Sequence, residues 1–175
     1  NMAPLFETIL DAIPAPEGDP DGDTQVLIST IDYNEYVGRI GVGKVERGTI
    51  SVNQELMLLN HHDPDKHERV KISKLYEFDG LNKVEVKSAT IGAIVAISGI
   101  ADIHIGDTLC AGDNPESIPF QKISEPTISM NFLVNDSPLA GQEGKYITSR
   151  HLRDRLYREL NTDVSLRVED TDTTE

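Results

Sequence analysis

The chain has 175 residues, a formal net charge of −14 at pH 7 and a hydrophobic content of 38%. This length suits one or two domains and is enough to bury a substantial core. The negative charge argues against general binding of nucleic acids or acidic membranes, unless a basic face is hidden within the average. Cys110 is the only cysteine, which excludes a disulfide framework and a cysteine metal cluster. No signal peptide or membrane-spanning apolar run is visible, so we expect a cytoplasmic protein with no membrane partner.

The first 20 residues combine a helix with a turn-rich segment. Pro4 suits a first helical turn, and Leu5, Ile9 and Ile13 are spaced four apart, which predicts an amphipathic helix over residues 4–13. The acidic, glycine-containing residues that follow favour a solvated linker. Their spacing does not fit an EF-hand calcium loop.

From residue 26 onward the apolar residues follow the two-residue period of β-strands. The apolar run at residues 91–97 is typical of a strand buried on both faces or lining a small barrel. Several short strands separated by turn residues predict a small closed β-barrel over residues 21–112. The predicted strands are residues 26–33, 36–46, 49–59, 69–78, 83–87, 91–97 and 108–109.

The pattern changes after a proline-marked linker at residues 113–125. Residues 127–134 alternate like a strand, residues 147–160 have leucines at helical spacing, and residues 164–168 again suggest a strand. This β-α-β order predicts the start of a second, α/β domain over residues 126–175. Because the last strand has no partner in the chain, we expect a piece of a longer protein, whose free strand edge invites pairing with another copy.

The sequence contains no catalytic constellation. His61, His62 and His67 are the only ligand-like cluster, and their position in a polar loop favours an exposed turn over a metal site. The glycines and lysine of residues 38–44 suggest a phosphate loop, but they lie within a strand pattern and do not open a helix. Nucleophile elbow, zinc-protease and Walker A motifs are not present.

The basic residues are unevenly distributed. Between Pro126 and Leu160 the sequence has five basic and four acidic residues, whereas the rest of the chain carries the excess acid. Clustered arginines on the predicted helix leave room for a phosphate-facing patch. Acidic neighbours at helical spacing are equally consistent with an ordinary solvated face.

Three segments together resemble a known family. Residues 37–56, VGRIGVGKVERGTISVNQEL, resemble the second-domain signature of translational GTPases, and residues 91–109, IGAIVAISGIADIHIGDTL, resemble the closing signature of the same barrel. Residues 135–150, NDSPLAGQEGKYITSR, are similar to the third-domain motif of the TypA/BipA subfamily, more so than to elongation factor G or LepA. Ala93 departs from the pattern, because many relatives have Asp there.

The resemblance implies a mainly β fold, in which a translation-factor-type Greek-key β-barrel of six or seven strands precedes a partial ferredoxin-like α/β domain. Residues 1–20 would be the helix and linker leaving a GTPase domain, residues 21–112 the barrel, residues 113–125 a linker and residues 126–175 the first part of the third domain. The GTPase domain, with its GTP and Mg²⁺, is expected before Asn1. We therefore expect neither a cofactor nor enzymatic activity in this chain itself.

The resemblance also implies partners and roles. The family binds the ribosome, including small-subunit rRNA and protein, and is linked to stress adaptation and ribosome assembly; this chain would also contact its own GTPase and C-terminal domains. Two alternatives are a stand-alone barrel that binds a protein or ligand, and a small-molecule enzyme using the loop at residues 61–67. The candidate RNA, ribosome or interdomain contacts are Arg39, Lys44, Arg47, Lys145, Arg150, Arg153 and Arg155.

Overall fold

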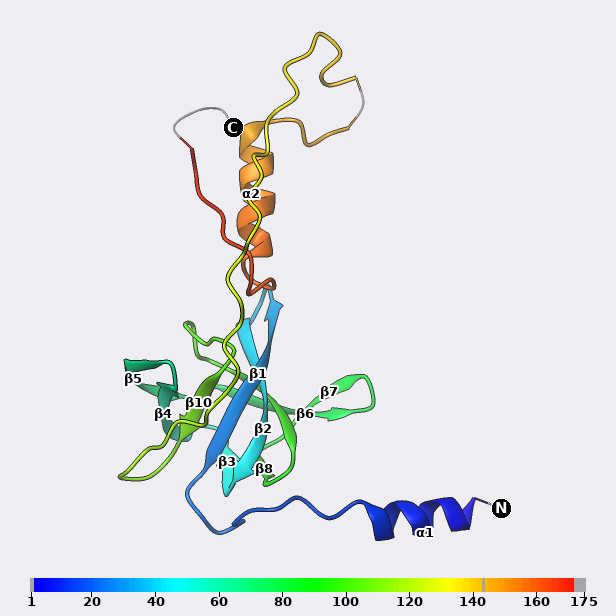
Figure 1. Cartoon of the computed structure of the whole chain (residues 1–175), viewed down its shortest axis with the longest axis vertical. Helices are drawn as coiled ribbons and strands as arrows, with labels where there is room; N and C mark the ends of the chain where they lie inside the picture. The colour runs from blue at the N-terminus through cyan, green and yellow to red at the C-terminus, as the bar shows by residue number, and fades with distance from the viewer. Residues whose placement is uncertain (1, 143, 172–175) are drawn as a thin grey trace. The chain divides into compact units, whose positions relative to one another are not determined.

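The computed structural model describes residues 2–142 and 144–171 of the chain (Figure 1). The chain divides into two compact units, Asn1–Gln121 and Lys122–Glu175. Neither helix in the described residues has the length and apolarity needed to cross a bilayer.

The first unit contains helix α1 and ten strands, as counted over its described residues. Helix α1 has a proline in its first turn, as expected, and buries none of its side chains. The bounds are α1 Ala3–Ala12, β1 Gln25–Asn34, β2 Gly38–Arg47, β3 Thr49–Ser51, β4 Glu55–Asn60, β5 Asp63–Lys71, β6 Lys74–Asp79, β7 Asn82–Glu85, β8 Ser88–Thr90, β9 Ile94–Ser98 and β10 Asp107–Cys110.

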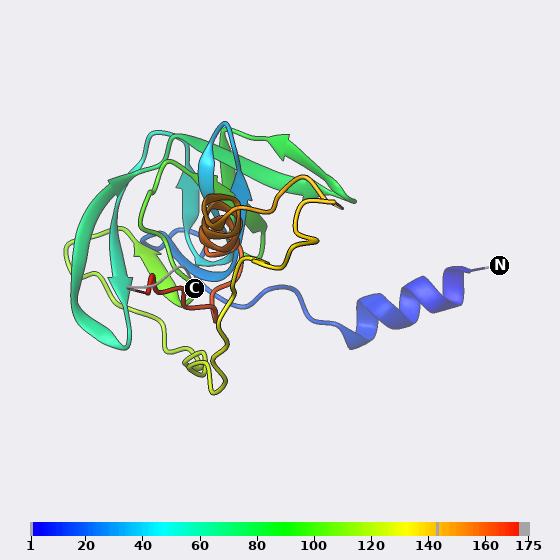
Figure 2. The ribbon, with the colours of Figure 1, turned by 90° about the horizontal axis from the view of Figure 1, so that it is seen from above.

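Eight of these strands form one antiparallel sheet in the order β5-β4-β10-β1-β2-β9-β6-β7, and β3 pairs with β8. The hairpin β1–β2 is therefore flanked by β9 and β10, which are neighbours in sequence but lie on opposite sides of it. Such non-local pairing is expected of a Greek-key barrel. Figure 2 shows the strands of this unit curling round a common centre.

Apolar side chains from nearly every strand fill that centre. Strand β9, the apolar run singled out in the sequence, has Val95, Ala96 and Ile97 fully buried, and all four residues of β10 are buried. The mainly β fold and the barrel predicted from the sequence are confirmed. The fully buried core includes Val26, Ile28, Val45, Ile50, Leu58, Ile72, Leu75, Ile103 and Leu109.

The barrel has more strands than the six or seven expected, because two predicted strands are each broken in two and the short strand β8 was not predicted. Residues 49–59 split into β3 and β4 at Asn53, whose φ of 66° turns the backbone into the left-handed region. Residues 69–78 split between β5 and β6 at Ser73, whose N–H donates to the carbonyl of Ser98. The alternation of apolar and polar residues in the sequence does not reveal these bends, because the two-residue period of the side chains continues across them.

Residues 113–121 run along the barrel surface and contact it at several points. The Phe120 ring covers Gly106 so closely that an added Cβ would overlap the ring. The Ile118 N–H donates to Thr108 Oγ1 over 2.9 Å, and Gln25 Nε2 donates to the Glu116 carbonyl over 2.9 Å. We call residues 113–121 the strap.

The second unit contains helix α2, Ser149–Glu159, as the leucine spacing predicted. The two flanking strands predicted at residues 127–134 and 164–168 are not formed: both segments lack a hydrogen-bonded strand neighbour among the described residues. In a ferredoxin-like "split" β-α-β unit, the strands on either side of the helix are separated by another strand. The alternating apolar residues therefore identified segments that are suited to a sheet. These two segments cannot form a sheet by themselves.

Candidate nucleic-acid interface

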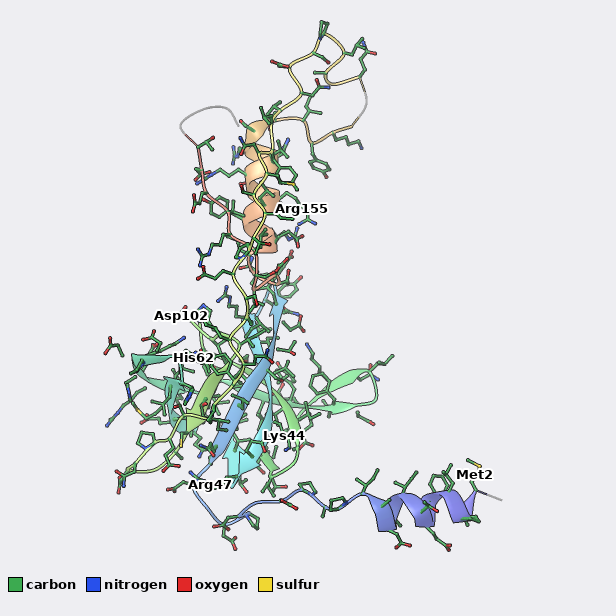
Figure 3. All side chains as sticks on the ribbon, viewed as in Figure 1. Met2, Lys44, Arg47, His62, Asp102 and Arg155 are labelled. Carbon is green, nitrogen blue, oxygen red and sulfur yellow. The ribbon has the colours of Figure 1, made fainter. Side chains whose placement is uncertain are left out.

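Three of the predicted basic contacts lie on strand β2 and already have partners within the barrel. Arg47 Nε donates to the Asp23 carbonyl over 2.9 Å, and the Arg47 stem lies against Gly22. Lys44 Nζ lies 2.8 Å from a carboxylate oxygen of Glu46. The labelled Lys44 and Arg47 side chains can be followed in Figure 3. The Arg47 contacts fix the loop that enters the barrel, whereas the Lys44–Glu46 pair lies within β2.

Arg39 also lies on β2 and reaches across to a neighbouring loop. Its Nη1 donates to the Ile103 carbonyl over 3.4 Å. A guanidinium has five N–H donors, so this hydrogen bond leaves donors for other contacts. The structure does not gather Arg39, Lys44 and Arg47 into one cluster of free cations.

Helix α2 carries the other group of predicted contacts. Thr148 is its N-cap: the Thr148 hydroxyl accepts a hydrogen bond from the His151 N–H, which satisfies a donor of the first turn. Leu152 and Leu156 form a stripe along one side. None of the helix residues is fully buried, so this stripe is only partly covered.

Arg153 lies beside the leucine stripe and clamps the segment that follows the helix. Its Nε and Nη2 atoms donate to the two Asp170 oxygens over 2.8 and 2.9 Å, and the Tyr157 hydroxyl donates to Asp170 over 3.0 Å. The Arg153 guanidinium also lies 4.9 Å from the centre of the Tyr157 ring. The paired guanidinium and the tyrosine hydroxyl hold the pKa of Asp170 below its usual value. Arg153 is therefore committed to an internal contact.

The remaining predicted arginines of α2 have weaker or more local partners. Arg150 Nε lies 4.0 Å from Asp154, and Arg155 pairs with Glu159 one turn further along. Both are pairs between exposed side chains at helical spacing, which contribute a few tenths of a kcal/mol. Lys145 is exposed in the loop before the helix.

Helical geometry separates these cations. At about 100° per residue, Arg153 and Arg155 lie roughly 80° to either side of the stripe formed by Leu152 and Leu156, whereas Arg158 lies roughly 140° from it. Arg150 and Arg153 also line a groove of about 1130 Å³, but Arg155 and Arg158 do not. The structure thus divides the arginines of the helix into a groove-lining pair and a pair outside the groove. The second pair includes Arg158, which belongs to the basic cluster of the sequence but was not among the predicted contacts.

A second basic row, on edge strand β5, was also missed. His67, Arg69 and Lys71 alternate along β5 and are exposed. Within the described residues, no ion pair joins Arg69 or Lys71 to an acidic side chain. The signal was present in the sequence as basic residues at every second position, a spacing that places them on one face of a strand.

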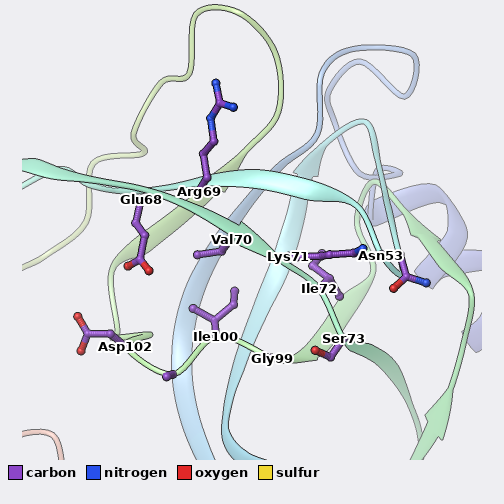
Figure 4. Close-up of a pocket in the computed structure, with 11 residues that line it drawn as sticks. Asn53, Glu68, Arg69, Val70, Lys71, Ile72, Ser73, Gly99, Ile100 and Asp102 are labelled. Carbon is purple, nitrogen blue, oxygen red and sulfur yellow. The ribbon is translucent and has the colours of Figure 1, made fainter.

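Beside β5 lies a cavity of about 430 Å³ (Figure 4). Val70, Ile72 and Ile100 provide its apolar lining, Glu68 and Asp102 lie at one end, and Arg69 projects away from it. The cavity lining contains no histidine or cysteine, and the described Lys71 and Ser73 side chains in it are not hydrogen-bonded to each other as a base and its nucleophile would be. Among the described residues, no group of three or more His, Cys, Asp or Glu is placed to hold a metal ion.

Two residues of the histidine cluster, His61 and His62, contact the strap. His62 Nε2 lies 2.9 Å from the Phe120 carbonyl, and the two rings meet edge to face at 4.7 Å. His61 Nδ1 lies 3.5 Å from the Ser117 hydroxyl. The structure therefore places these two side chains against residues 113–121, while His67 lies further along on β5.

One buried ion pair was not anticipated from the sequence. Asp107, in the I-G-D-T-L segment, is 0% exposed and accepts hydrogen bonds from Lys66 Nζ at 2.9 Å, the His104 N–H at 2.8 Å and Asn60 Nδ2 at 2.8 Å. Lys66 Nζ also donates to the Asp102 carbonyl over 3.1 Å. In the sequence, the dipeptide Gly106-Asp107 is typical of a turn. The available signal for an inward carboxylate was an acidic residue two positions from the apolar residues Ile105 and Leu109.

Comparison with known proteins bears on both units. The family model described as Elongation factor Tu domain 2 matches residues 38–110. A crystal structure of a Thermus thermophilus protein superimposes with a TM-score of 0.67 and 22% identity, covering 97% of this chain and 24% of that one. This second likeness supports the fold alone.

Curated relatives extend the match across the chain. The "Large ribosomal subunit assembly factor BipA" of Synechocystis sp. is 49% identical over 175 residues, which are 100% of this chain and 29% of that protein. The proteins of the same name from Bacillus subtilis and Escherichia coli K12 are 46% and 44% identical, each over 98% of this chain and 28% of their own length. The chain belongs to the TypA/BipA family.

Every predicted contact residue lies within the alignments to the BipA proteins, but only some of these residues also lie within the region matched by the domain 2 model. Arg39, Lys44 and Arg47 lie within the region matched by the domain 2 model, as do Lys66 and Asp107. Helix α2 lies outside that region but within the alignments to the BipA proteins. The chain spans less than a third of the length of these relatives.

Proposed function

We propose that the chain is a ribosome-binding part of a TypA/BipA-type GTPase that acts in ribosome assembly. The observation that carries this proposal is the 42–49% identity, over 98–100% of the chain, to proteins named large ribosomal subunit assembly factors. A role in stress adaptation in the cytoplasm, expected from the family resemblance, belongs to the same proposal.

The role of this chain is binding and positioning. GTP and Mg²⁺ belong, in this proposal, to a GTPase domain of the parent protein, and the residues of the two units described above do not take part in hydrolysis. The barrel is a rigid scaffold with a contiguous core, which suits it to hold surfaces in place. Its outward basic residues would meet either RNA phosphates or the other domains of the parent protein.

Helix α2 offers the strongest phosphate-facing surface. Arg155, Arg158 and the preceding Lys145 lie away from the groove, on an exposed side of the helix or its entry loop. We propose these three as the main RNA contacts, with Arg150 at their margin. Arg153 contributes by orienting the segment after the helix. The three cations of β2 remain proposed contacts, through N–H donors that do not take part in their internal hydrogen bonds. These residues are Arg39, Lys44 and Arg47.

The test is co-sedimentation of the 175-residue chain with purified ribosomal subunits, small and large in separate tubes, at low salt. The proposal expects the chain to pellet with ribosomal particles and to remain in the supernatant without them. Binding to the small subunit would agree with the small-subunit RNA contact implied by the family resemblance. If the chain pellets with neither subunit, the proposed function of these two units is wrong.

A further inference from the structure

Strand β5 is an outer strand of the eight-stranded sheet, and the cavity beside it lies along its free side. On its other side β5 pairs with β4. The cavity, of about 430 Å³, is lined mainly by residues 68–73 and, opposite them, by residues 99–102 of the loop between β9 and β10 (Figure 4). Both linings lie within residues 38–110, the region that the domain 2 model matches, so neither is near an end of the chain.

The cavity begins where the pairing of β6 with β9 stops. Lys74 pairs with Ser98, and the N–H of the preceding Ser73 donates to the Ser98 carbonyl over 3.0 Å. The chain then turns at Gly99, whose φ of 106° lies in a region that favours glycine, and leaves the sheet. If β9 continued straight, its next residues would lie beside β5. The cavity therefore occupies the position of a strand next to β5.

The hydrogen-bond pattern of β5 shows which backbone groups face the cavity. The Ile72 N–H donates to the Gln54 carbonyl, and the Ile72 carbonyl accepts from the Asn53 N–H, so both groups of Ile72 point to the β4 side. In an antiparallel strand, successive residues direct their backbone groups to opposite sides. Arg69 and Lys71 therefore direct their N–H and C=O groups towards the cavity. Within the part of the chain that the structure describes, no strand pairs with them there.

The side chains of β5 differ between its two faces. On the outer face, Arg69 and Lys71 are exposed, and among the described residues neither forms an ion pair with an acidic side chain. On the inner face, Val70 is buried and belongs to the same core cluster as Ile72 and Ile100. A strand beside β5 would therefore have cations next to its outer face and apolar side chains next to its inner face.

The cavity has room for a short extended segment. The Ser73–Ser98 hydrogen bond closes one end, and at the other end Lys66 Nζ donates to the Asp102 carbonyl over 3.1 Å. Lys66 and Ser73 are seven positions apart, which is about 24 Å along a strand. A segment of five residues is about 17 Å long when extended, so it fits between the two closing contacts.

We propose that the free edge of β5 binds an extended acidic segment of a partner protein by strand addition. The segment lies antiparallel to β5, as in every other strand pair of this sheet that the structure describes. Its acidic residues lie opposite Arg69 and Lys71, and each of these two pairs exchanges two backbone hydrogen bonds. Apolar residues alternate with the acidic ones and face the cavity beside Val70 and Ile100.

Charge excludes the other occupants of this edge. A second copy of the chain would bring another β5, and its cations would face Arg69 and Lys71, an arrangement that destabilises a strand pair. A basic segment is excluded for the same reason. On the inner side, Glu68 and Asp102 lie at one end of the cavity, so acidic residues are favoured on the outer face alone. The partner segment is therefore one in which acidic and apolar residues alternate.

This proposal is independent of ribosome binding and is tested on the 175-residue chain by NMR titration with the capped peptide acetyl-Glu-Val-Glu-Val-Glu-amide. At about 0.15 M salt, charges more than roughly 8 Å away are largely screened, so the distant acidic residues of the chain do not decide the result. We expect saturable shifts in the amide signals of Arg69, Lys71 and residues 99–102. The capped peptide Lys-Val-Lys-Val-Lys is the control and should not bind. No saturable shift at millimolar glutamate peptide, or equal binding of the lysine peptide, overturns the proposal.

Two N-methylated forms of the glutamate peptide separate strand addition from simple charge attraction. In the proposed pairing the glutamate N–H groups donate to β5, whereas the valine N–H groups point away from it. Methylation of the glutamate nitrogens should therefore abolish binding, and methylation of the valine nitrogens should leave it unchanged. Equal binding of the two forms would mean that Arg69 and Lys71 hold any polyanion, such as RNA, and would overturn strand addition.

Charge reversal in the chain locates the contact. Arg69→Glu together with Lys71→Glu should weaken binding of the glutamate peptide by more than about tenfold and allow the lysine peptide to bind. Because this variant gains a ligand, its loss of the other peptide is not explained by misfolding. Lys122→Glu is the control: Lys122 is exposed and outside the cavity lining, so this variant should bind the glutamate peptide like the unmodified chain. Unchanged binding in the double variant, or a similar loss in Lys122→Glu, contradicts the proposed contact.

Discussion

Among individual residues, Arg153 and Arg155 show how two arginines on one helix take different roles. Arg153 makes a two-point contact with Asp170 and stacks near Tyr157, whereas Arg155 pairs only with an exposed glutamate one turn away. The sequence identified both as basic helix residues. It could not separate them, because the partner of Arg153 lies 17 residues further along the chain.

The Arg153 clamp predicts a pH dependence. Arg153 and Tyr157 lower the pKa of Asp170, so the clamp contributes fully at pH values above the ordinary aspartate pKa and is lost as pH falls through the lowered one. An NMR titration of the Asp170 carboxyl should therefore give a midpoint below the usual value of 3.8. In Arg153→Gln the midpoint should rise towards that value. Equal midpoints in the two proteins would contradict the clamp.

The buried Lys66–Asp107 pair predicts a large stability effect. In Lys66→Met the Asp107 carboxylate, which is 0% exposed, would lose its charged partner, and removing one member of a buried pair typically costs about 3–5 kcal/mol. The free energy of unfolding, measured by urea denaturation, should fall by about this amount. Lys74→Met is the control, since Lys74 and Glu85 form an exposed pair, and such pairs contribute little to stability. Similar losses in the two variants would show that Asp107 does not depend on Lys66.

On the scale of elements, the strap depends on the fit between Phe120 and Gly106. Gly106 has a φ of 88°, and an added Cβ would meet the Phe120 ring. Gly106→Ala should therefore displace the strap and speed hydrogen exchange and proteolysis of residues 113–121. Gly80→Ala is the matched control, because Gly80 also has a positive φ, of 60°, but has nothing within 4 Å of an added Cβ. Equal protection of the strap in both variants would mean that Phe120 does not anchor it.

The elements that the sequence predicted well are those whose signals are local. Helix α2 has a capping threonine and a leucine stripe, and β2 has alternating valines and isoleucine, so both were identified within a few residues of their ends. The break at Asn53 depends on backbone dihedrals, and the inward turn of Asp107 depends on Lys66, which is distant in sequence. Neither the break at Asn53 nor the orientation of Asp107 changes the two-residue period of apolar residues in the sequence.

The strands predicted at residues 127–134 and 164–168 were wrong for a related reason. Periodicity reports which side chains suit a half-buried face, but a strand also needs a neighbour with which to exchange backbone hydrogen bonds. Among the described residues these two segments have none. Their exposed apolar side chains and the groove between them are the structural consequence.

For the whole molecule, charge is the property that limits the functional proposal. Residues 1–121 have 20 acidic and 9 basic residues, a net charge of −11, whereas residues 122–175 have 10 acidic and 7 basic residues, a net charge of −3, so the second unit is closer to neutral. A chain of this charge binds RNA only through a local cluster of cations, and most of the barrel cations predicted from the sequence have internal partners. We therefore propose the solvent-facing side of α2 as the surface on which ribosome binding depends most.

The most direct test is the salt dependence of binding to ribosomal subunits, measured by co-sedimentation of the chain and two variants over a salt series. Each lost phosphate contact lowers the slope of log K against log salt by about one unit. Arg155→Gln combined with Lys145→Gln should therefore lower the slope by about two units. Arg153→Gln, which removes a clamped arginine, should leave the slope unchanged. An unchanged slope in the double variant, or an equal loss in Arg153→Gln, would contradict the assignment of this surface.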